Sequence, residues 1–331
     1  MKTYTALLWA RTMEFIRDRG TFFWNLLFPI ILVVGFSFAF SNNNDTLFKV
    51  GFFGTPEGSA GAILDLSAID AVPYETDREA AVEKLRRHQV DMLIDFGNGE
   101  YYLNGESSSS ELLRIIASDA LPEFREQAVT GKPIRYVDWL VPGVIGMNML
   151  FSCMFGVGFV IVRYRKNGVL KRMKATPVSP FTFITAQMGS RFMIVLITSI
   201  LVFSGTNLFL RFVMNGSYLL LLLVTILAIL CMISLGLIFA ARLKSEELAS
   251  GLMNLMTFPM IIFSGVFFSL EGTPKIMQSA SRVFPLTHFI EAARAIMIDG
   301  ATLGGIMPNI LVLAGMTGAF LLIASMLFRW E

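Results

Sequence analysis

The 331-residue sequence has little charge, and this shortage excludes whole classes of protein. Charged residues make up only 16% of the chain, hydrophobic residues make up 54%, and the mean hydropathy is +0.63. An average soluble domain carries about 25% charged residues, so a soluble enzyme and a disordered tail are both excluded. The formal charge of +2 gives no basic excess of the kind that attracts nucleic acid. The composition indicates a polytopic membrane protein.

Motifs for covalent chemistry are also missing. The phosphate-binding pattern G-x-x-x-x-G-K-[S/T] does not occur, because Gly131-Lys132 is followed by Pro133. His88 and His288 have no Cys or His neighbour at metal-ligand spacing, and no Ser-His-Asp arrangement stands out. We therefore expect no catalytic residue, metal site or cofactor in this chain.

Long runs without charge organise the sequence. About 20 helical residues cross the hydrocarbon core of a membrane, and the chain has six charge-free runs of about that length or more: 20–44, 139–162, 192–210, 212–241, 248–270 and 300–328. We predict six transmembrane helices. The first run ends in Phe38-Ala39-Phe40 rather than in a small-x-small cleavage site, so we predict a retained anchor and not a cleaved signal peptide. The two cysteines, Cys153 and Cys231, both lie in such runs.

Basic residues in the short loops predict the orientation. Thirteen Lys and Arg lie in segments 1–19, 163–174, 242–247 and 329–331. The alternate loops contain only Arg211, Lys275, Arg282 and Arg294. Cytoplasmic loops carry the excess of Lys and Arg. We therefore expect a multi-pass protein of the cytoplasmic (inner) membrane, with both termini in the cytoplasm and 329–331 as a short cytoplasmic tail.

The hydrophilic block 42–138 is expected outside the membrane as a folded α/β domain. Strands are predicted at Phe48 to Phe53, Val90 to Phe96 and Tyr101 to Leu103, with a hairpin turn at Gly97-Asn98-Gly99. Capping-box spacings begin at Thr76 and Ser108 and predict helices at 77–88 and 109–129, the second interrupted near Pro122.

Arg191 is the one charge inside an expected span, in a helix that we predict to begin near Phe181. We expect its guanidinium to reach the membrane interface or to pair there. Carriers coupled to protons or sodium keep ionisable groups at mid-membrane, and the other spans have none. The sequence therefore disfavours an ion-coupled carrier and favours energy supplied by another chain.

A basic segment follows the second run. It reads RYRKNGVLKRMKATPVSP from Arg163 to Pro180, and Val169, Leu170 and Met173 form an apolar edge beside the basic residues. Such a pattern is typical of a short amphipathic helix on a membrane surface. A plain positive-inside anchor that touches anionic lipid is the alternative.

Two stretches resemble a known family. GVLKRMKATPVSP, from Gly168 to Pro180, is similar to the cytoplasmic loop between helices two and three of ABC type-2 exporter permeases, the membrane subunits of ATP-driven export pumps. FSGVFFSL from Phe263, then Pro274, FPLTHFIEAARA from Phe284, and Asp299-Gly300 resemble that family's segment between helices five and six. The resemblance covers essentially the whole chain.

The resemblance implies a fold. It is a membrane all-α protein with six transmembrane helices, re-entrant helices between helices five and six, and an extracytoplasmic α/β domain between helices one and two. The corresponding segments are 1–19 (interfacial elbow helix), 20–41 (helix 1), 42–138 (α/β domain), 139–328 (helices 2–6), 163–180 (coupling loop) and 269–299 (re-entrant segment). A plain lipid anchor is the alternative for 1–19.

The resemblance also implies partners and the residues that contact them. Two separate ABC ATPase subunits would bind ATP and Mg²⁺, beside a second copy of this permease or a similar one and membrane lipid. The residues expected to couple to the ATPase are Arg11, Arg163, Arg165, Lys166, Gly168, Leu170, Lys171, Arg172, Lys174, Thr176 and Pro177.

Further residues are candidates for a gate and a pathway. Glu291 and Arg294 are one helical turn apart, so they can form a structural ion pair or, together with Pro285, an extracytoplasmic gate. The candidates for the pathway are Asn25, Pro29, Asn148, Asn254 and Pro259. Each of these five can equally be a helix-packing residue or a tolerated kink.

We therefore expect the permease subunit of an ATP-driven exporter that moves an amphipathic compound, such as a drug, lipid, antibiotic or glycolipid, by alternating access. The alternative is a membrane sensor or assembly factor whose external domain binds a ligand.

Overall fold

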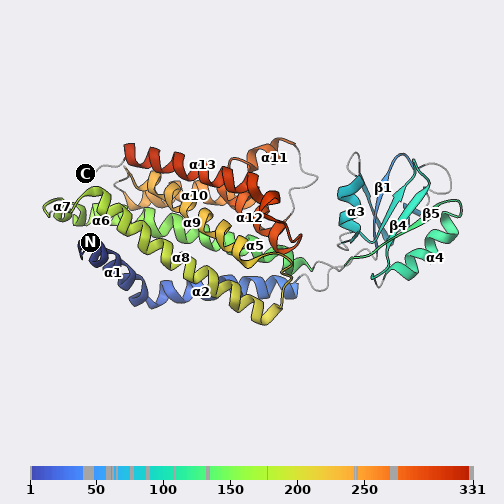
Figure 1. Ribbon diagram of the computed structural model, residues 1–331, viewed down its shortest axis with the longest axis horizontal. Coiled ribbons are helices and arrows are strands. Elements are labelled where there is room, and N and C mark those ends of the chain that lie inside the picture. The colour runs from blue at the N-terminus through green and yellow to red at the C-terminus, as the bar shows by residue number, and fades with distance from the viewer. Residues whose placement is uncertain are drawn as a thin grey trace. The chain divides into compact units, whose positions relative to one another are not determined.

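The computed structural model forms two compact units. It describes residues 2–39, 48–56, 61, 63–64, 66–74, 78–86, 90–107, 109–131, 135–176, 178–241, 243, 245–268 and 275–327. The helical unit contains Met1–Phe38 and Val137–Glu331, and the α/β unit contains Ala39–Tyr136 (Figure 1). Several predictions lie outside the described residues: the tail 329–331, residues 269–274 of the re-entrant segment, Thr76, Ser108 and Pro177.

The helical unit consists of helices from both ends of the chain (Figure 1). They are α1 (Lys2–Arg17), α2 (Arg19–Ala39), α5 (Tyr136–Cys153), the π-helix η2 (Met154–Phe159), α6 (Val160–Lys166), α7 (Val169–Lys174), α8 (Pro180–Leu210), α9 (Tyr218–Ala240), α10 (Glu246–Phe263), α11 (Lys275–Ser281), α12 (Pro285–Met297) and α13 (Leu303–Leu327). Within the described residues, the predicted charge-free runs fall on α2, on α5 with η2 and α6, and on α8, α9, α10 and α13.

Four helical segments of the described chain are long and apolar enough to cross a membrane: 136–166, 181–210, 218–240 and 303–327. The pair α1 and α2, which is bent by 60°, is a fifth candidate. The remaining predicted span is α10, an 18-residue helix that begins with Glu246 and Glu247. The chain is thus mostly helical, with four to five candidate spans.

Glycines bring the central helices close together. A Cβ on Gly236 of α9 would lie 3.3 Å from the Cys153 carbonyl oxygen, and a Cβ on Gly146 of α5 would lie 2.8 Å from the Leu286 side chain of α12. Small residues let helix backbones approach closely, which supplies packing energy where lipid weakens the hydrophobic effect. α9 consequently contacts α8, α12, α13 and η2.

The two long helices α8 and α13 expose apolar side chains. On α13, only Ile306, Leu313 and Ala324 are buried, while Leu322 and Met326 are 67% and 83% exposed. Water would disfavour so large an apolar surface, whereas lipid or a second membrane subunit would accept it.

Three parts of the helical unit that are distant in sequence lie at one of its ends. The start of α1, the short helix α7 and the C-terminal end of α13 are together there (Figure 1). The loop after α9 lies at this end too, because Arg165 of α6 binds the last carbonyl groups of α9. The segments predicted to be cytoplasmic therefore share one end of the helical unit.

The α/β unit has a five-stranded sheet in the order β2-β1-β3-β4-β5. Its elements are β1 (Phe48–Phe53), β2 (Ile69–Pro73), α3 (Arg78–Arg86), β3 (Met92–Asp95), β4 (Glu100–Asn104), α4 (Ser110–Ala120) and β5 (Arg125–Val129). β3 and β4 form the predicted antiparallel hairpin, and the other neighbouring pairs are parallel. In the turn, Asp95 Oδ1 accepts hydrogen bonds from the backbone N–H groups of Gly97 and Asn98, both at 3.0 Å.

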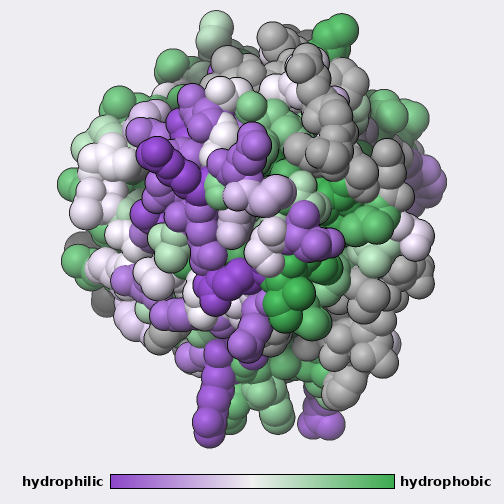
Figure 2. Space-filling view, turned by 90° about the vertical axis from the view of Figure 1, so that its right-hand side faces the viewer, coloured by the Kyte–Doolittle hydropathy of each residue, from purple (hydrophilic) through white to green (hydrophobic). Residues whose placement is uncertain are grey.

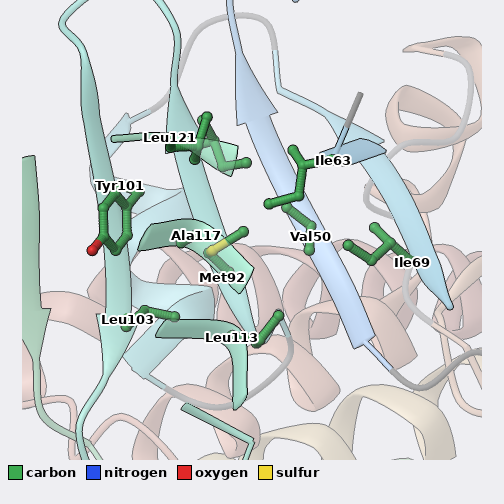
Figure 3. Packing of buried hydrophobic residues seen from close by; sticks show 10 residues of the cluster. Val50, Ile63, Ile69, Met92, Tyr101, Leu103, Leu113, Ala117 and Leu121 are labelled. Carbon is green, nitrogen blue, oxygen red and sulfur yellow. The ribbon is translucent and has the colours of Figure 1, made fainter. Parts of the chain in front are cut away.

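Alternating side chains give this sheet two apolar faces. On one face, Val50, Met92 and Leu103 pack against Leu113 and Ala117 of α4 (Figure 3). On the other face lies a second cluster: Leu93, Val129 and, from α3, Ala81 and Leu85. The outer surface mixes hydrophilic and apolar side chains (Figure 2).

One prediction in this unit is wrong. The expected helix 109–129 ends at Ala120, and residues Arg125–Val129 form strand β5. Pro122 ends the helix, and the following residues pair with β4 through parallel sheet hydrogen bonds. Strand β2 has no counterpart among the sequence predictions either. β1 begins and ends where it was predicted, and α3 confirms the helix expected at 77–88 over its described residues.

Candidate functional site

The basic segment after α6 folds as a short exposed helix. Gly168 has φ +69°, a left-handed conformation that favours glycine, and it separates α6 from α7. Leu170 is fully buried, whereas Lys171, Arg172, Lys174 and Thr176 are exposed. The pattern therefore correctly indicated a short amphipathic helix that is anchored by one leucine and presents its basic residues outward.

Arg165 fixes this segment to the rest of the helical unit. Its guanidinium donates hydrogen bonds to the carbonyl oxygens of Ala240 (2.9 Å), Ala241 (3.1 Å) and Leu243. The last carbonyls of a helix lack partners within the helix, and cations stabilise that end. Lys166 adds long contacts to Glu246 (3.7 Å) and Glu247 (3.8 Å). Arg165 thus holds α7 at the junction of α9 and α10, and is not itself an outward-facing contact.

The N-terminal helix packs against α8. Thr12 Oγ1 and Ser190 Oγ are 2.9 Å apart, and a Cβ on Gly189 would lie 2.8 Å from the Tyr4 hydroxyl. Small residues on α8 therefore let α1 approach closely. α1, predicted as an elbow, is a packed part of the helical unit.

A cavity of about 520 Å³ lies among α1, α2, α5, η2, α6 and α8. Its charged lining residues are Arg11, Glu14, Asp18, Arg163 and Arg191. Its aromatic lining residues are Phe15, Phe151, Phe155 and Phe159. The cavity therefore combines arginines with aromatic surface.

Arg191 lies inside the helical unit, so the expectation that it reaches the membrane interface is wrong. Its side chain is only 7% exposed, its Nε donates to the Ser152 carbonyl oxygen at 2.6 Å, and its Cζ lies 5.4 Å from the centre of the Phe15 ring. Two local features accommodate it: a Cβ at Gly156 would overlap the guanidinium, and the backbone changes to a π-helix just after Ser152. π-helical turns interrupt the regular α-helical ladder and frequently mark functional sites.

Arg11 belongs to a compact network beside the cavity. Its Nη1 is 2.7 Å from Glu14 Oε2, and its Nη2 donates to the Gly156 carbonyl oxygen at 3.2 Å. The Tyr164 hydroxyl donates to the same Glu14 oxygen at 2.5 Å. Glu14 is therefore already engaged by α1 and α6.

At the other end of the unit, the predicted pairing of Glu291 with Arg294 is wrong, since no ion pair between these two described residues is present. Arg294 Nε donates to the Trp139 carbonyl oxygen (3.1 Å) and Nη2 donates to that of Gly265 (2.8 Å), while Cζ stacks 3.4 Å from the Trp139 ring centre. Glu291 lies on the exposed face of α12. Pro285 is buried at the first turn of α12. The carbonyls beside a loop attract Arg294 more than a hydrated carboxylate does.

The pathway candidates do not gather at one place in the described structure. Asn25 alone of the five lines the cavity, where its Oδ1 accepts a hydrogen bond from Ser152 Oγ at 2.5 Å. Pro29 is buried inside α2, and the other three, Asn148, Asn254 and Pro259, are partly buried in α5 and α10.

Sequence reasoning missed the cavity. Arg191 stood out as a lone charge, but its surroundings depend on Gly156 and on the π-helix, neither of which has a distinct signal inside an apolar run. Glu14 and Tyr164 are 150 residues apart in sequence. Only the packing of α1 against α6 brings them together.

The helical unit, with its exposed apolar helices, its buried Arg191 and its basic surface helix, is that of a multi-pass membrane protein. A model of the ABC-2 family of transporter proteins matches residues 19–326, and the chain belongs to this family. The predicted resemblance is therefore confirmed.

Individual relatives are more distant. The chain is 28% identical over 186 residues to the inner membrane transport permease YhhJ of Escherichia coli, which covers 55% of this chain and 49% of YhhJ. It is 25% identical over 185 residues to the linearmycin resistance permease protein LnrN of Bacillus subtilis, covering 55% and 46%. It is 18% identical over 271 residues to the probable multidrug ABC transporter permease YbhR of Escherichia coli, covering 76% and 72%. The chain thus spans about half the length of YhhJ and LnrN.

Proposed function

We propose that this chain is the permease subunit of an ATP-driven exporter that moves an amphipathic compound across the cytoplasmic membrane. Membership of the ABC-2 family supports transport. Two relatives, LnrN and YbhR, are named for antibiotic resistance and for multidrug transport, which supports an amphipathic substrate. ATP and Mg²⁺ would be bound by two separate ATPase subunits, and a second permease copy or a similar permease would complete the pathway.

The proposal rests mainly on the contacts that attach α7 to the rest of the helical unit. Lys171 and Arg172 are exposed for contact with a partner, Leu170 anchors the helix, and Arg165 ties its base to the end of α9. Force on α7 would therefore reach α9, which contacts α8, α12 and α13. A surface helix coupled in this way to the central helix is suited to transmit the movement of an ATPase.

Charge reversal on α7 tests this coupling. The tagged permease is purified together with candidate ATPase subunits, and ATPase activity is measured with and without amphipathic compounds. Lys171→Glu with Arg172→Glu should abolish stimulated activity, while membrane insertion is unchanged. The matched control reverses two exposed charges of the α/β unit, Lys49→Glu with Arg125→Glu, and should retain it. Normal export by the α7 variant would contradict the proposal, and absence of any bound ATPase would favour the sensor.

The proposed orientation puts α7 in the cytoplasm and the α/β unit outside. A cysteine replacing exposed Asn98 should react with a membrane-impermeant maleimide in intact cells, and one replacing exposed Asn167 should react only after lysis. The native Cys153 and Cys231 are buried and give a low background. The opposite labelling pattern would invert the topology.

A further inference from the structure

The cavity of the helical unit contains more positive charge than its own residues neutralise. Glu14 is engaged by Arg11 and by the Tyr164 hydroxyl. Within the part of the chain that the structure describes, no carboxylate lies within 4.0 Å of the Arg163 or Arg191 guanidinium. Asp18 also lines the cavity, so three arginines face two carboxylates and leave a net charge of +1. The arginines of α6 and α8 are the two that have no carboxylate at ion-pair distance.

The burial of Arg191 makes an unpaired positive charge in this cavity energetically unfavourable. The residue is more than nine-tenths buried, and the only hydrogen bond that it makes to the described residues is from Nε to Ser152. Arg191 lines the cavity, and its two terminal nitrogens make no hydrogen bond to the described residues. A charge within a membrane-spanning unit is expensive unless it is paired, and such residues generally mark functional sites.

The rest of the cavity is suited to hydrocarbon. The rings of Phe15, Phe151, Phe155 and Phe159 line it beside the arginines. Its volume of about 520 Å³ is in the range of small-molecule sites, which combine apolar walls with a few convergent polar groups. Arginine guanidinium groups are well matched to phosphate, to which they can donate two parallel hydrogen bonds.

We propose that this cavity binds the phosphate-bearing head of an anionic amphiphile. Arg191 and Arg163 hold the phosphate, and the phenylalanines contact the adjoining hydrocarbon. A phospholipid of the membrane and a single-chain amphipathic compound offer the same chemistry. The occupied site bridges α1, α6 and α8, so the ligand fastens the N-terminal helix to the base of α7. This inference stands without the proposed export activity, because binding needs no ATPase.

Native mass spectrometry of the full chain in neutral detergent tests the proposal, with phosphatidylglycerol and phosphatidylcholine of identical acyl chains as the probes. The wild-type chain should bind phosphatidylglycerol about tenfold more tightly, because both lipids present a phosphate to the arginines but only phosphatidylcholine adds a quaternary ammonium that the same arginines repel. Arg191→Gln should remove this preference. Arg163→Gln, at an exposed position that tolerates replacement, should reduce it several-fold. The matched control is Lys171→Gln on α7, which removes an exposed charge outside the cavity and should change nothing.

Competition with dodecyl phosphate distinguishes the two possible sources of the ligand, a membrane phospholipid and a single-chain amphipathic compound. Displacement of phosphatidylglycerol by dodecyl phosphate, with the same dependence on Arg163, supports a site for single-chain compounds. Failure of dodecyl phosphate to compete, with the preference for phosphatidylglycerol intact, supports a site for membrane lipid. Equal dissociation constants for the two phospholipids in the wild-type chain would overturn the proposal. Wild-type affinity for phosphatidylglycerol in Arg163→Gln would overturn it too, even if Arg191→Gln failed to fold.

Discussion

The α/β unit and the helical unit of this chain differ in which side chains stabilise each of them internally. In the α/β unit, Leu93, Leu103 and Leu113 are fully buried, while ion pairs such as Arg114–Glu126 lie at the surface. In the helical unit, α13 exposes most of its leucines, and Arg165, Arg191 and Arg294 each donate hydrogen bonds to backbone carbonyls of another helix or loop. Apart from Asp95, the charged side chains described in the α/β unit are partly or fully exposed, whereas the helical unit buries Arg191 and Asp138.

The solvent accounts for this difference. Water drives apolar side chains into the core of the α/β unit, with about 25 cal/mol for each Å² of apolar surface removed from it. Lipid is as apolar as leucine, so helices within it associate through close packing and polar contacts. The same residue type therefore has different roles in the two units: leucine fills the core of the α/β unit, whereas in the helical unit it fills the core and also covers much of the outer surface.

The largest expected effect is in the α/β core. Leu113→Ala removes a fully buried side chain and should destabilise this unit by about 2–5 kcal/mol. Hydrogen exchange of the full chain should show faster exchange in β1, β3 and β4. The neighbouring Leu112→Ala, at a position 58% exposed, is the control and should change little. Equal loss of protection in the helical unit would show that the two units do not unfold separately.

The second-largest expected effect is the destabilisation of the helical unit by Arg294→Gln. It removes charge-assisted hydrogen bonds to the carbonyls of Trp139 and Gly265, at a cost of about 1.5–3 kcal/mol. The apparent melting temperature of the detergent-solubilised chain should fall accordingly. Glu291→Gln on the exposed face of α12 is the control, and it should stay within about 0.5 kcal/mol. An equal fall in melting temperature in both variants would support the ion pair between Glu291 and Arg294 that sequence spacing predicted.

Gly143→Ala measures close packing in the helical unit. The added Cβ would lie 2.5 Å from the Val266 carbonyl oxygen, so we expect destabilisation of about 1–3 kcal/mol in a thermal unfolding assay. Gly251→Ala is the matched control, since nothing lies within 4 Å of its Cβ and alanine favours a helix. A neutral Gly143→Ala would mean that backbone approach contributes little to this unit.

The smallest expected effect is a pH dependence in the α/β unit. The Tyr102 hydroxyl donates to Glu100 and, together with Arg78, holds the pKa of that carboxyl below its usual value of 4.5. The stabilisation is present above the pKa of the unfolded chain and is lost as the pH falls through the lower folded pKa. Hydrogen exchange in β4 should accelerate slightly more on acidification in the wild-type chain than in Glu100→Gln. Identical acid responses would show that the contact adds nothing.

Sequence patterns predicted some elements well because their signals are local. β1, the turn at residues 97–99 and α7 depend on a short apolar and aromatic run, on glycine and on a short amphipathic edge, all of which can be read within a few residues. β5 could not be predicted this way, because its sequence REQAV has no apolar alternation and becomes a strand only by pairing with β4. Glu291 and Arg294 have the spacing of a helical ion pair, but Arg294 instead donates hydrogen bonds to the carbonyl oxygens of Trp139 and Gly265, which sequence spacing could not reveal.

The sequence by itself determined that this chain enters a membrane, because six charge-free runs are too apolar for water, and it determined the family through motifs that keep their order along the chain. Only the tertiary structure decided where Arg191 lies and that a cavity surrounds it. Those features require α1, η2, α6 and α8 to meet, and they depend on the space beside Gly156 and on the π-helix that follows Ser152. Hydropathy is a property of each segment alone, whereas a buried charge is tolerated only through the partners that folding brings to it.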